Sequence, residues 1–316
     1  MKPSVIVWDL ETLPDLTGFA AANDLVGQTE ANIREALGNK FPKHIYHTIV
    51  CIGALIAHRE PDHWALDAVG APHVGERTEK QLIVSFCDKI AELKPQLVTL
   101  NGNSFDLPVL RYRAMIHSVS APGLAARLYF NRYTEDAVDL CDILSSFAPH
   151  SKASLNELSK IMGLPGKPEG IDGAEVERYF LEGKTKEIAD YCAVDVVNTY
   201  RVWLRYELFR GRLSESEHQA SERCLADFIG ARVKTPPHFH RAPEGPELRI
   251  AEMEGSHRAS APAGKATSID TWVADLLDKP EEKRAASLYE LLLRLNLDMS
   301  HLDEAREAYV RRLGLR

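Results

Sequence analysis

Residues 5–12 read Val-Ile-Val-Trp-Asp-Leu-Glu-Thr, and this stretch decides the fold. Val5 to Trp8 are β-branched or aromatic and follow Pro3, which predicts a buried strand. Asp9 and Glu11 come where this strand is expected to end, and side chains two residues apart lie on one face of a strand. Two such carboxylates repel each other unless one is protonated or a cation lies between them. Taken alone, the pair is explained better by a solvated acidic strand end.

The apolar pattern predicts further elements along the chain. Buried strands are expected over 49–57, 64–69 and 96–100, and the apolar spacing from 79 to 93 predicts a helix that Lys94-Pro95 ends. Later helices are predicted over 105–116, 155–162, 174–181, 186–209 and 214–230. A hairpin-like group of strands, then strand–helix units and then helices indicate an α/β domain with a mixed sheet flanked by helices.

Two later motifs carry further acids. Taken alone, Asp106 is explained better as a helix N-terminal Asp, but it also follows the strand predicted over 96–100, at the carboxyl end where open α/β sheets keep their sites. Tyr191 and Asp195 are four residues apart on a predicted helix and so share one face. An Asp among apolar neighbours is costly to bury without a partner or a metal, but it could also lie on an exposed face.

The carboxylate motifs taken together are stronger evidence for a metal site than any one of them alone. Together the motifs supply four carboxylates and one phenol, from a strand, the end of a later strand and a late helix. Four carboxylates can hold two Mg2+ or Mn2+ ions about 4 Å apart, and such a pair binds a scissile phosphate.

In this order the motifs resemble a known superfamily. DLET at 9–12, NGNSFD at 101–106 and YCAVD at 191–195 resemble the three exonuclease motifs of the DEDD superfamily, and the tyrosine resembles its DEDDy branch. The likeness is strongest to the predicted 3'-5' exonucleases related to the proofreading domain of family B DNA polymerases, and it covers about residues 3 to 213. Further likenesses are DLCD at 139–142, SLNEL at 154–158, GLPGKPEGIDG at 163–173 and DVVNTY at 195–200.

The resemblance implies a ribonuclease H-like fold and a metal-dependent 3'-5' exonuclease with two Mg2+ or Mn2+ ions. It implies that Asp9 bridges both metals, that Glu11 and Asp195 complete the first site, and that Asp106 serves the second. It also implies that Tyr191 orients, or helps to deprotonate, the attacking water.

The expected substrate is a nucleic acid with a free 3' end, with single-stranded DNA favoured over RNA. The resemblance implies that Thr12 and Asn101 lie near the terminal nucleotide. Lys152 and Lys167 could contact phosphates, although solvated surface charge explains them equally well. Phe105 could stack on a base, but core packing is the simpler role.

Composition limits the other possibilities. The formal net charge of -8 argues against wide, nonspecific binding of duplexes. Five scattered cysteines without a C-x-x-C pair argue against structural zinc and suggest reduced thiols. The first residues do not resemble a signal peptide, and no apolar run is long enough for a membrane helix. We therefore expect a soluble, cytoplasmic protein with no membrane partner.

Four segments are predicted. Residues 1–213 form the exonuclease domain, and 214–234 form a helical extension. Residues 235–268, rich in Pro, Gly, Ala, Ser and Glu, are expected to be a flexible linker. Residues 269–316 form a helical tail whose role the sequence does not reveal.

Three alternative functions remain. One is a 3'-5' exoribonuclease of the same superfamily, because no sequence feature reports contacts to a 2'-OH. Another is a catalytically inactive nucleic-acid-binding module, against which stands the presence of every motif carboxylate. The third is a haloacid-dehalogenase-like phosphatase, which needs a second Asp where this chain has Glu11.

Overall fold

A computed structural model describes residues 2–164 and 175–232 of the 316-residue chain. Its strands form one sheet in the order β3-β2-β1-β4-β5. They are β1 (Ser4–Pro14), β2 (His47–Arg59), β3 (Trp64–Gly70), β4 (Gln96–Thr99) and β5 (Ala137–Asp139). Strand β2 is antiparallel to β1 and β3, whereas β4 is parallel to β1 and β5 is parallel to β4. This is the ribonuclease H-like mixed sheet that the sequence predicts.

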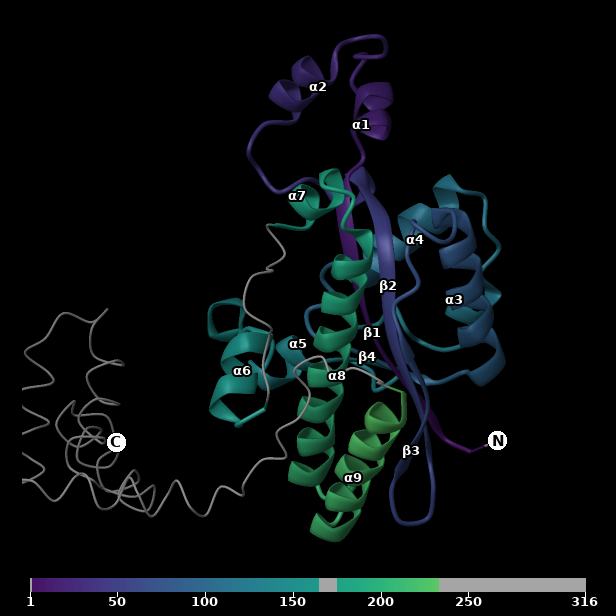
Figure 1. Cartoon of the computed structure of the whole chain (residues 1–316), viewed down its shortest axis with the longest axis vertical. Helices are drawn as coiled ribbons and strands as arrows, with labels where there is room; N and C mark the ends of the chain where they lie inside the picture. The colour runs from purple at the N-terminus through teal and green to yellow at the C-terminus, as the bar shows by residue number, and fades with distance from the viewer. Residues whose placement is uncertain (1, 165–174, 233–316) are drawn as a thin grey trace, which may run out of the picture. The chain divides into compact units, whose positions relative to one another are not determined.

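Helices cover both faces of the sheet (Figure 1). In chain order the described helices are α1 (Leu16–Ala22), α2 (Glu30–Leu37), α3 (Glu79–Leu93), α4 (Asp106–Ile116), α5 (Leu140–Leu144), α6 (Leu155–Ile161), α7 (Val176–Leu181), α8 (Thr185–Phe209) and α9 (Glu215–Arg232). Helices α3 and α4 lie on one side of β1, and α8 lies on the other, while α1 and α2 project beyond one end of the sheet (Figure 1).

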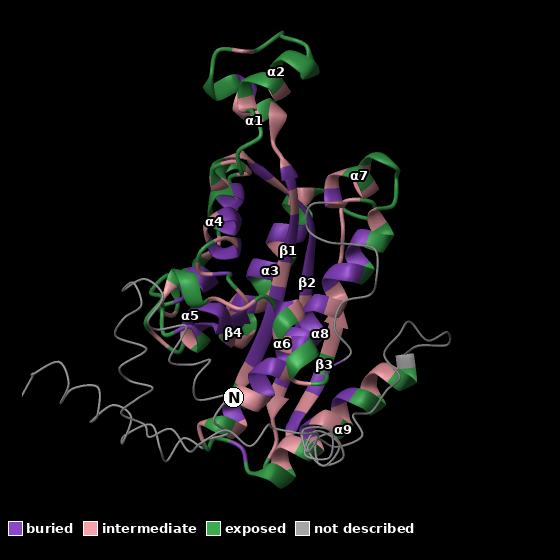
Figure 2. Cartoon of the chain, turned by 90° about the vertical axis from the view of Figure 1, so that its left-hand side faces the viewer, coloured by how far each residue is buried: buried purple, intermediate pink, exposed green. Residues whose placement is uncertain are grey.

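The central strand β1 is buried on both faces, as Figure 2 shows. Val5 and Val7 pack with Trp203 of α8 on one face. Ile6 and Trp8 pack on the other face in the cluster that contains residues of α3 and α4. Such a strand has no polar face, so a polar side chain on it needs a local reason.

Most predicted elements are confirmed, and one boundary was wrong. The helix predicted over 79–93 is α3, and Thr78 with Gln81 forms a capping box at its start. The first strand does not end at Trp8 but continues to Pro14, because β2 pairs with it over the whole length. The sequence did not predict α1, α2, β5 or α5.

The C-terminal predictions have different outcomes. The helix expected over 214–230 is α9, which is the described part of the helical extension. The predicted linker over 235–268 and the predicted helical tail over 269–316 lie outside the described residues. In the described ranges no helix is long and apolar enough to span a membrane.

A buried ion-pair network joins the helices of one face to the sheet. Glu79, at the start of α3, accepts hydrogen bonds from Arg113 Nε at 2.7 Å and from the Ile49 backbone N–H at 2.7 Å. The other Glu79 oxygen lies 2.6 Å from Arg113 Nη2 and 2.7 Å from His117 Nε2. Arg113 also donates to Asp15 at 2.6 Å. One guanidinium therefore ties α4 to α3 and to the residue that caps α1.

Arg113→Met is expected to lower the free energy of unfolding by about 3–5 kcal/mol, because it leaves a buried carboxylate without its cation. The matched control is Arg34→Met, which removes an exposed arginine from two surface ion pairs and should cost less than about 1 kcal/mol. Urea denaturation of both variants measures the difference. An equal loss of unfolding free energy in the two variants would show that the buried network stabilises the fold no more than a surface ion pair does.

The pKa of Glu79 sets how the stabilising contribution of this ion-pair network depends on pH. Burial by itself raises the pKa of Glu79, but hydrogen bonds from Arg113, the Ile49 N–H and His117 outweigh it and lower the pKa below the ordinary 4.5. The contribution is therefore complete above pH 4.5 and is lost as the pH falls through the folded-state pKa. The stability difference between wild type and Arg113→Met should shrink in acid.

Candidate active site

The first two acids lie side by side on β1. Asp9 and Glu11 pair with Gly53 and Cys51 of β2, and a bulge follows directly between Glu11 and Thr12. One ligand atom each from Asp9, Glu11 and Cys192 lies within 4.8 Å of the others. On its other edge β1 pairs with β4 only from Val5 to Val7. The carboxylates therefore lie where β4 has left β1, at an opening of the sheet.

Asp106 approaches from the helix layer that contains α4. Its Oδ1 accepts a hydrogen bond from the Leu10 backbone N–H at 3.0 Å, so its carboxylate is held at the residue between Asp9 and Glu11. Burial raises the pKa of Asp106 to about 7, although its backbone hydrogen bonds oppose the shift. A cation bound beside Asp106 would favour its ionised form, because a nearby positive charge lowers the pKa of a carboxyl group.

Tyr191 and Asp195 approach from the opposite face, on α8. Both are buried, and they lie one turn apart. Burial raises the pKa of Tyr191, and the charges of Asp195, Glu11 and Asp9 raise it further. The structure thus brings the phenol among three of the four predicted acids, and Asp106 joins them through Leu10.

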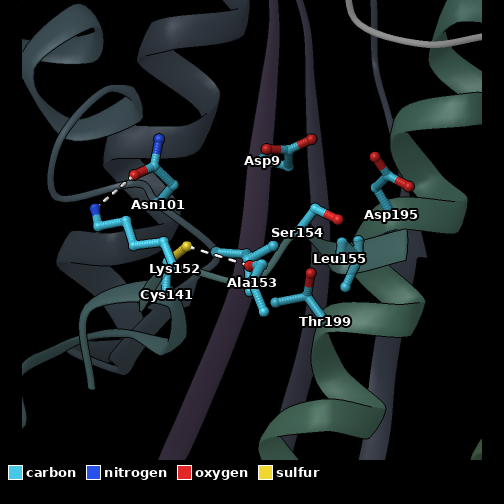
Figure 3. Close-up of a pocket in the computed structure, with 10 residues that line it drawn as sticks. Asp9, Asn101, Cys141, Lys152, Ala153, Ser154, Leu155, Asp195 and Thr199 are labelled. Carbon is cyan, nitrogen blue, oxygen red and sulfur yellow. Dashed lines mark hydrogen bonds between the residues drawn. The ribbon is translucent and has the colours of Figure 1, made fainter. Parts of the chain in front are cut away.

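A cavity of about 410 Å³ opens beside these acids, and Figure 3 shows its walls. Asp9 and Asp195 line it, together with Leu100, Asn101, Cys141, Lys152, Ala153, Ser154, Leu155 and Thr199. Lys152 Nζ donates to Asn101 Oδ1 at 3.0 Å and also pairs with Asp142 Oδ1 at 3.0 Å. Two of the predicted substrate residues, Asn101 and Lys152, therefore line the same cavity as two predicted acids.

Thr12 and Phe105 lie together but not among the residues that line this cavity. Thr12 Oγ1 lies 3.0 Å from His47 Nδ1, and the rings of His47 and Phe105 are 5.0 Å apart in an edge contact. Phe41 lies 5.5 Å from Phe105, and Phe41 is itself 74% exposed. Phe105 itself is partly buried and packs against the core cluster that contains residues of α3 and α4. Lys167 lies outside the described residues.

Asp139 is a residue whose role the sequence did not reveal. It is buried, and it accepts hydrogen bonds from the backbone N–H of Asn101 at 2.8 Å and of Asn103 at 3.0 Å. It also caps α5 through the N–H of Cys141. Burial raises the pKa of Asp139. Asp139 therefore shapes the loop between β4 and Asp106, and the DLCD likeness was its only sequence signal.

Gly53 is the second residue that sequence reasoning missed. A Cβ at Gly53 would lie 2.6 Å from Cys192 Sγ and 3.2 Å from the Cys192 carbonyl oxygen, both on α8. Because Gly53 pairs with Asp9, the absence of a side chain there allows α8 to approach the strand that carries the acids. One glycine in a strand is a weak sequence signal for such an approach.

The donor set fits a hard divalent cation. Asp9 and Glu11 offer oxygen, which Mg2+ and Mn2+ prefer. The hydrogen bond with Cys51, and then burial, raise the pKa of Cys192 well above its ordinary value. The thiol is thus kept protonated, with its sulfur 3.7 Å from the carbonyl oxygen of Asp9, and it is a poor ligand in that form.

Comparison with known proteins shows the family of the chain. Residues 39–242 match a family described as predicted 3'-5' exonucleases related to the exonuclease domain of PolB. The chain belongs to this exonuclease family. The matched residues include Asp106, Tyr191 and Asp195 and begin after Asp9 and Glu11. Among curated proteins, no relative matches this chain.

Solved structures with a similar fold are distant. One is the family B DNA polymerase from the hyperthermophilic archaeon Pyrobaculum calidifontis, with 18% identity, a TM-score of 0.44 and coverage of 66% of this chain and 25% of the polymerase. Another is an ExoI/SSB-Ct complex, with 12% identity, a TM-score of 0.30 and coverage of 64% and 44%. A product-bound exonuclease I has 13% identity, a TM-score of 0.30 and coverage of 64% and 47%. The chain spans less than half the length of each.

Gly53→Ala is expected to lower exonuclease kcat by about 100-fold, because the new methyl group would push α8 and Asp195 away from Asp9, and a misplacement of about 1 Å in an active site can cost a factor of this size. Gly70→Ala on β3 is the matched control, since a Cβ there meets nothing within 4 Å. Thermal melting shows whether both variants fold. Equal kcat values for the two folded variants would mean that α8 does not need this close approach.

Proposed function

We propose that this exonuclease hydrolyses phosphodiester bonds from the 3' end of single-stranded DNA by a two-metal mechanism. The observation that carries the proposal is the convergence of acids from β1, α4 and α8 at the opening where β4 leaves β1. Asp9, Glu11, Asp106 and Asp195 would hold two divalent cations, Mg2+ or Mn2+. When bound, such cations neutralise charge on the scissile phosphate and lower the pKa of the attacking water.

The side chains have distinct parts in this proposal. Asp9 is clustered with Glu11 and also lines the cavity with Asp195, so it would help to hold the cations together with both of these acids. Asp106 is locked to the Leu10 N–H, so it is pre-organised and costs little reorganisation. The Tyr191 hydroxyl, among the acids, would hold the attacking water in line with the phosphate.

The cavity supports a single strand as the substrate. Its volume of about 410 Å³ lies within the usual range for one small ligand, roughly 300–1,000 Å³, and is far too small for a duplex. Lys152 would contact a phosphate and Asn101 the terminal nucleotide, since the two are hydrogen-bonded to each other on one wall (Figure 3). Thr12 and Phe105 would contact the same nucleotide from outside that wall.

RNA is the second candidate substrate. The cavity contains hydroxyl and amide groups, Ser154, Thr199 and Asn101, that are able to bond a 2'-OH as well as a phosphate. DNA is favoured by the family, whose description refers to the exonuclease domain of PolB. The predicted boundaries, with the nuclease domain over 1–213, remain part of this proposal.

The deciding experiment is a time course on 5'-labelled single-stranded DNA and on RNA of the same sequence, with Mg2+, Mn2+ or EDTA. A ladder that shortens from the 3' end only with a cation is the expected result, and Asp9→Ala and Asp195→Ala should abolish it. The matched control is Asp190→Ala, which removes an exposed carboxylate from the same helix. Full activity in EDTA, or in either site variant, would refute the two-metal assignment.

Tyr191→Phe is expected to lower kcat by about 100-fold without changing the affinity for Mn2+, because it removes only the hydroxyl that positions the water. Tyr206→Phe makes the same change further along α8 and should leave kcat unchanged. Single-turnover kinetics and Mn2+ titration read the two effects separately. An unaltered rate in Tyr191→Phe would remove this residue from the mechanism.

A further inference from the structure

An exposed group of aromatic rings and a cation lies beside the cavity. It consists of Arg132, Tyr133 and Phe147, named here the Arg132 patch. The Tyr133 and Phe147 rings are 5.1 Å apart with a 53° tilt, and the Arg132 guanidinium lies 5.9 Å and 5.6 Å from their centroids. Tyr133 is 74% exposed and Phe147 is 37% exposed. Exposed apolar side chains that cluster on a surface often mark an interaction site.

One buried residue connects this patch to the active-site cavity. The Asp142 side chain is fully buried, and its Oδ2 accepts a hydrogen bond from Arg132 at 2.7 Å. Its Oδ1 lies 3.0 Å from Lys152 Nζ, which lines the cavity. Its backbone carbonyl accepts the Phe147 N–H at 2.7 Å. The Lys152 ammonium in the cavity and the Arg132 guanidinium in the patch therefore pair with the same carboxylate, that of Asp142.

The backbone holds Phe147 in the patch at a cost. Ser146 and Phe147 both have positive φ, 52° and 62°, a conformation that bulky side chains rarely adopt. If the Phe147 ring were buried, core packing would offset the strain of this turn, but the ring is partly exposed. The bond to Asp142 keeps the turn in place.

The charge of the patch favours an anionic ligand. The acids that follow Tyr133 on the same loop already have cationic partners: Glu135 pairs with Arg210 and Arg212, and Asp136 pairs with Arg127. Arg132 pairs with Asp142, whose side chain has no exposed surface, while 43% of the Arg132 side chain is exposed. The surface therefore presents a cation beside two rings that contact each other.

We propose that the Arg132 patch binds the nucleotides on the 5' side of the 3' end, as an unpaired strand. Bases would stack on Tyr133 and Phe147, and Arg132 would contact the phosphate between them. Aromatic side chains combined with positive charge are the chemistry by which proteins bind single strands without sequence preference. A duplex hides the faces of its bases, so the patch selects unpaired ends. The direction of the strand rests on the proposed function, and the binding itself does not.

The test uses the whole chain and 5'-fluorescein-labelled dT3 and dT12 in EDTA, with Kd measured by fluorescence anisotropy. The readout is the ratio of Kd for dT3 to Kd for dT12. Wild type should prefer dT12, and Tyr133→Ala should lower the ratio about tenfold, as expected for one lost stacking contact. Tyr133→Phe keeps the ring and should keep the ratio. Arg132→Gln should reduce the salt dependence of dT12 binding by about one unit of slope.

Three results would overturn the proposal: an unchanged ratio in folded Tyr133→Ala, an equal loss in Tyr133→Phe, or no preference for dT12 in wild type. The last two would point to a hydroxyl contact or to a protein ligand for the patch. Circular dichroism melts establish that the variants fold. Because EDTA removes divalent cations, the oligonucleotides are not hydrolysed during the binding measurement. A failure of the exonuclease assay is therefore distinguished from a failure of the patch to bind the strand.

Discussion

Repulsion between carboxylates is the constraint on which the site depends. Asp9 and Glu11 lie close enough for their oxygens and the Cys192 sulfur to fall within 4.8 Å, and Asp106 and Asp195 approach from opposite faces of the sheet. Such a group is stable only if something holds each acid in place and a positive charge compensates them. The chain supplies the first condition with backbone donors, as the Leu10 N–H does for Asp106. A pair of divalent cations would supply the second.

The topology of the sheet creates the opening in which the acids can lie close together. Strand β4 follows β1 only as far as Val7, and the chain then turns into the loop that Asp139 holds. On the other side, Gly53 allows α8 to lie against the sheet beside Asp9. The acids thus meet at an opening with one wall made by a helix and one by a loop. The same loop wall carries Lys152, and through Asp142 it is joined to the aromatic surface outside.

The elements that were predicted correctly share a cause. Helix α3 was predicted at its observed bounds because its apolar spacing and its start and stop signals agree. Strand β5 has only three residues, so it shows no period and depends on pairing with β4. Strand β1 extends past Trp8 because β2 offers partners to Pro14, and pairing of this kind is invisible in the sequence of one strand.

The candidate site divides in the same way. The sequence by itself singled out the four acids and Tyr191 as candidates, because chemistry restricts residue types and the motifs occur in a specific order. It also indicated Asn101 and Lys152, which the structure places on one wall of the cavity. Only the tertiary structure decided the roles of Asp139, Asp142 and Gly53. Each acts through residues of another element. Asp139 bonds the backbone of a distant loop, Asp142 shares its carboxylate between Arg132 and Lys152, and Gly53 leaves room for α8 because it has no side chain. Long-range contacts of this kind leave no local pattern, so they exist only once the chain has folded.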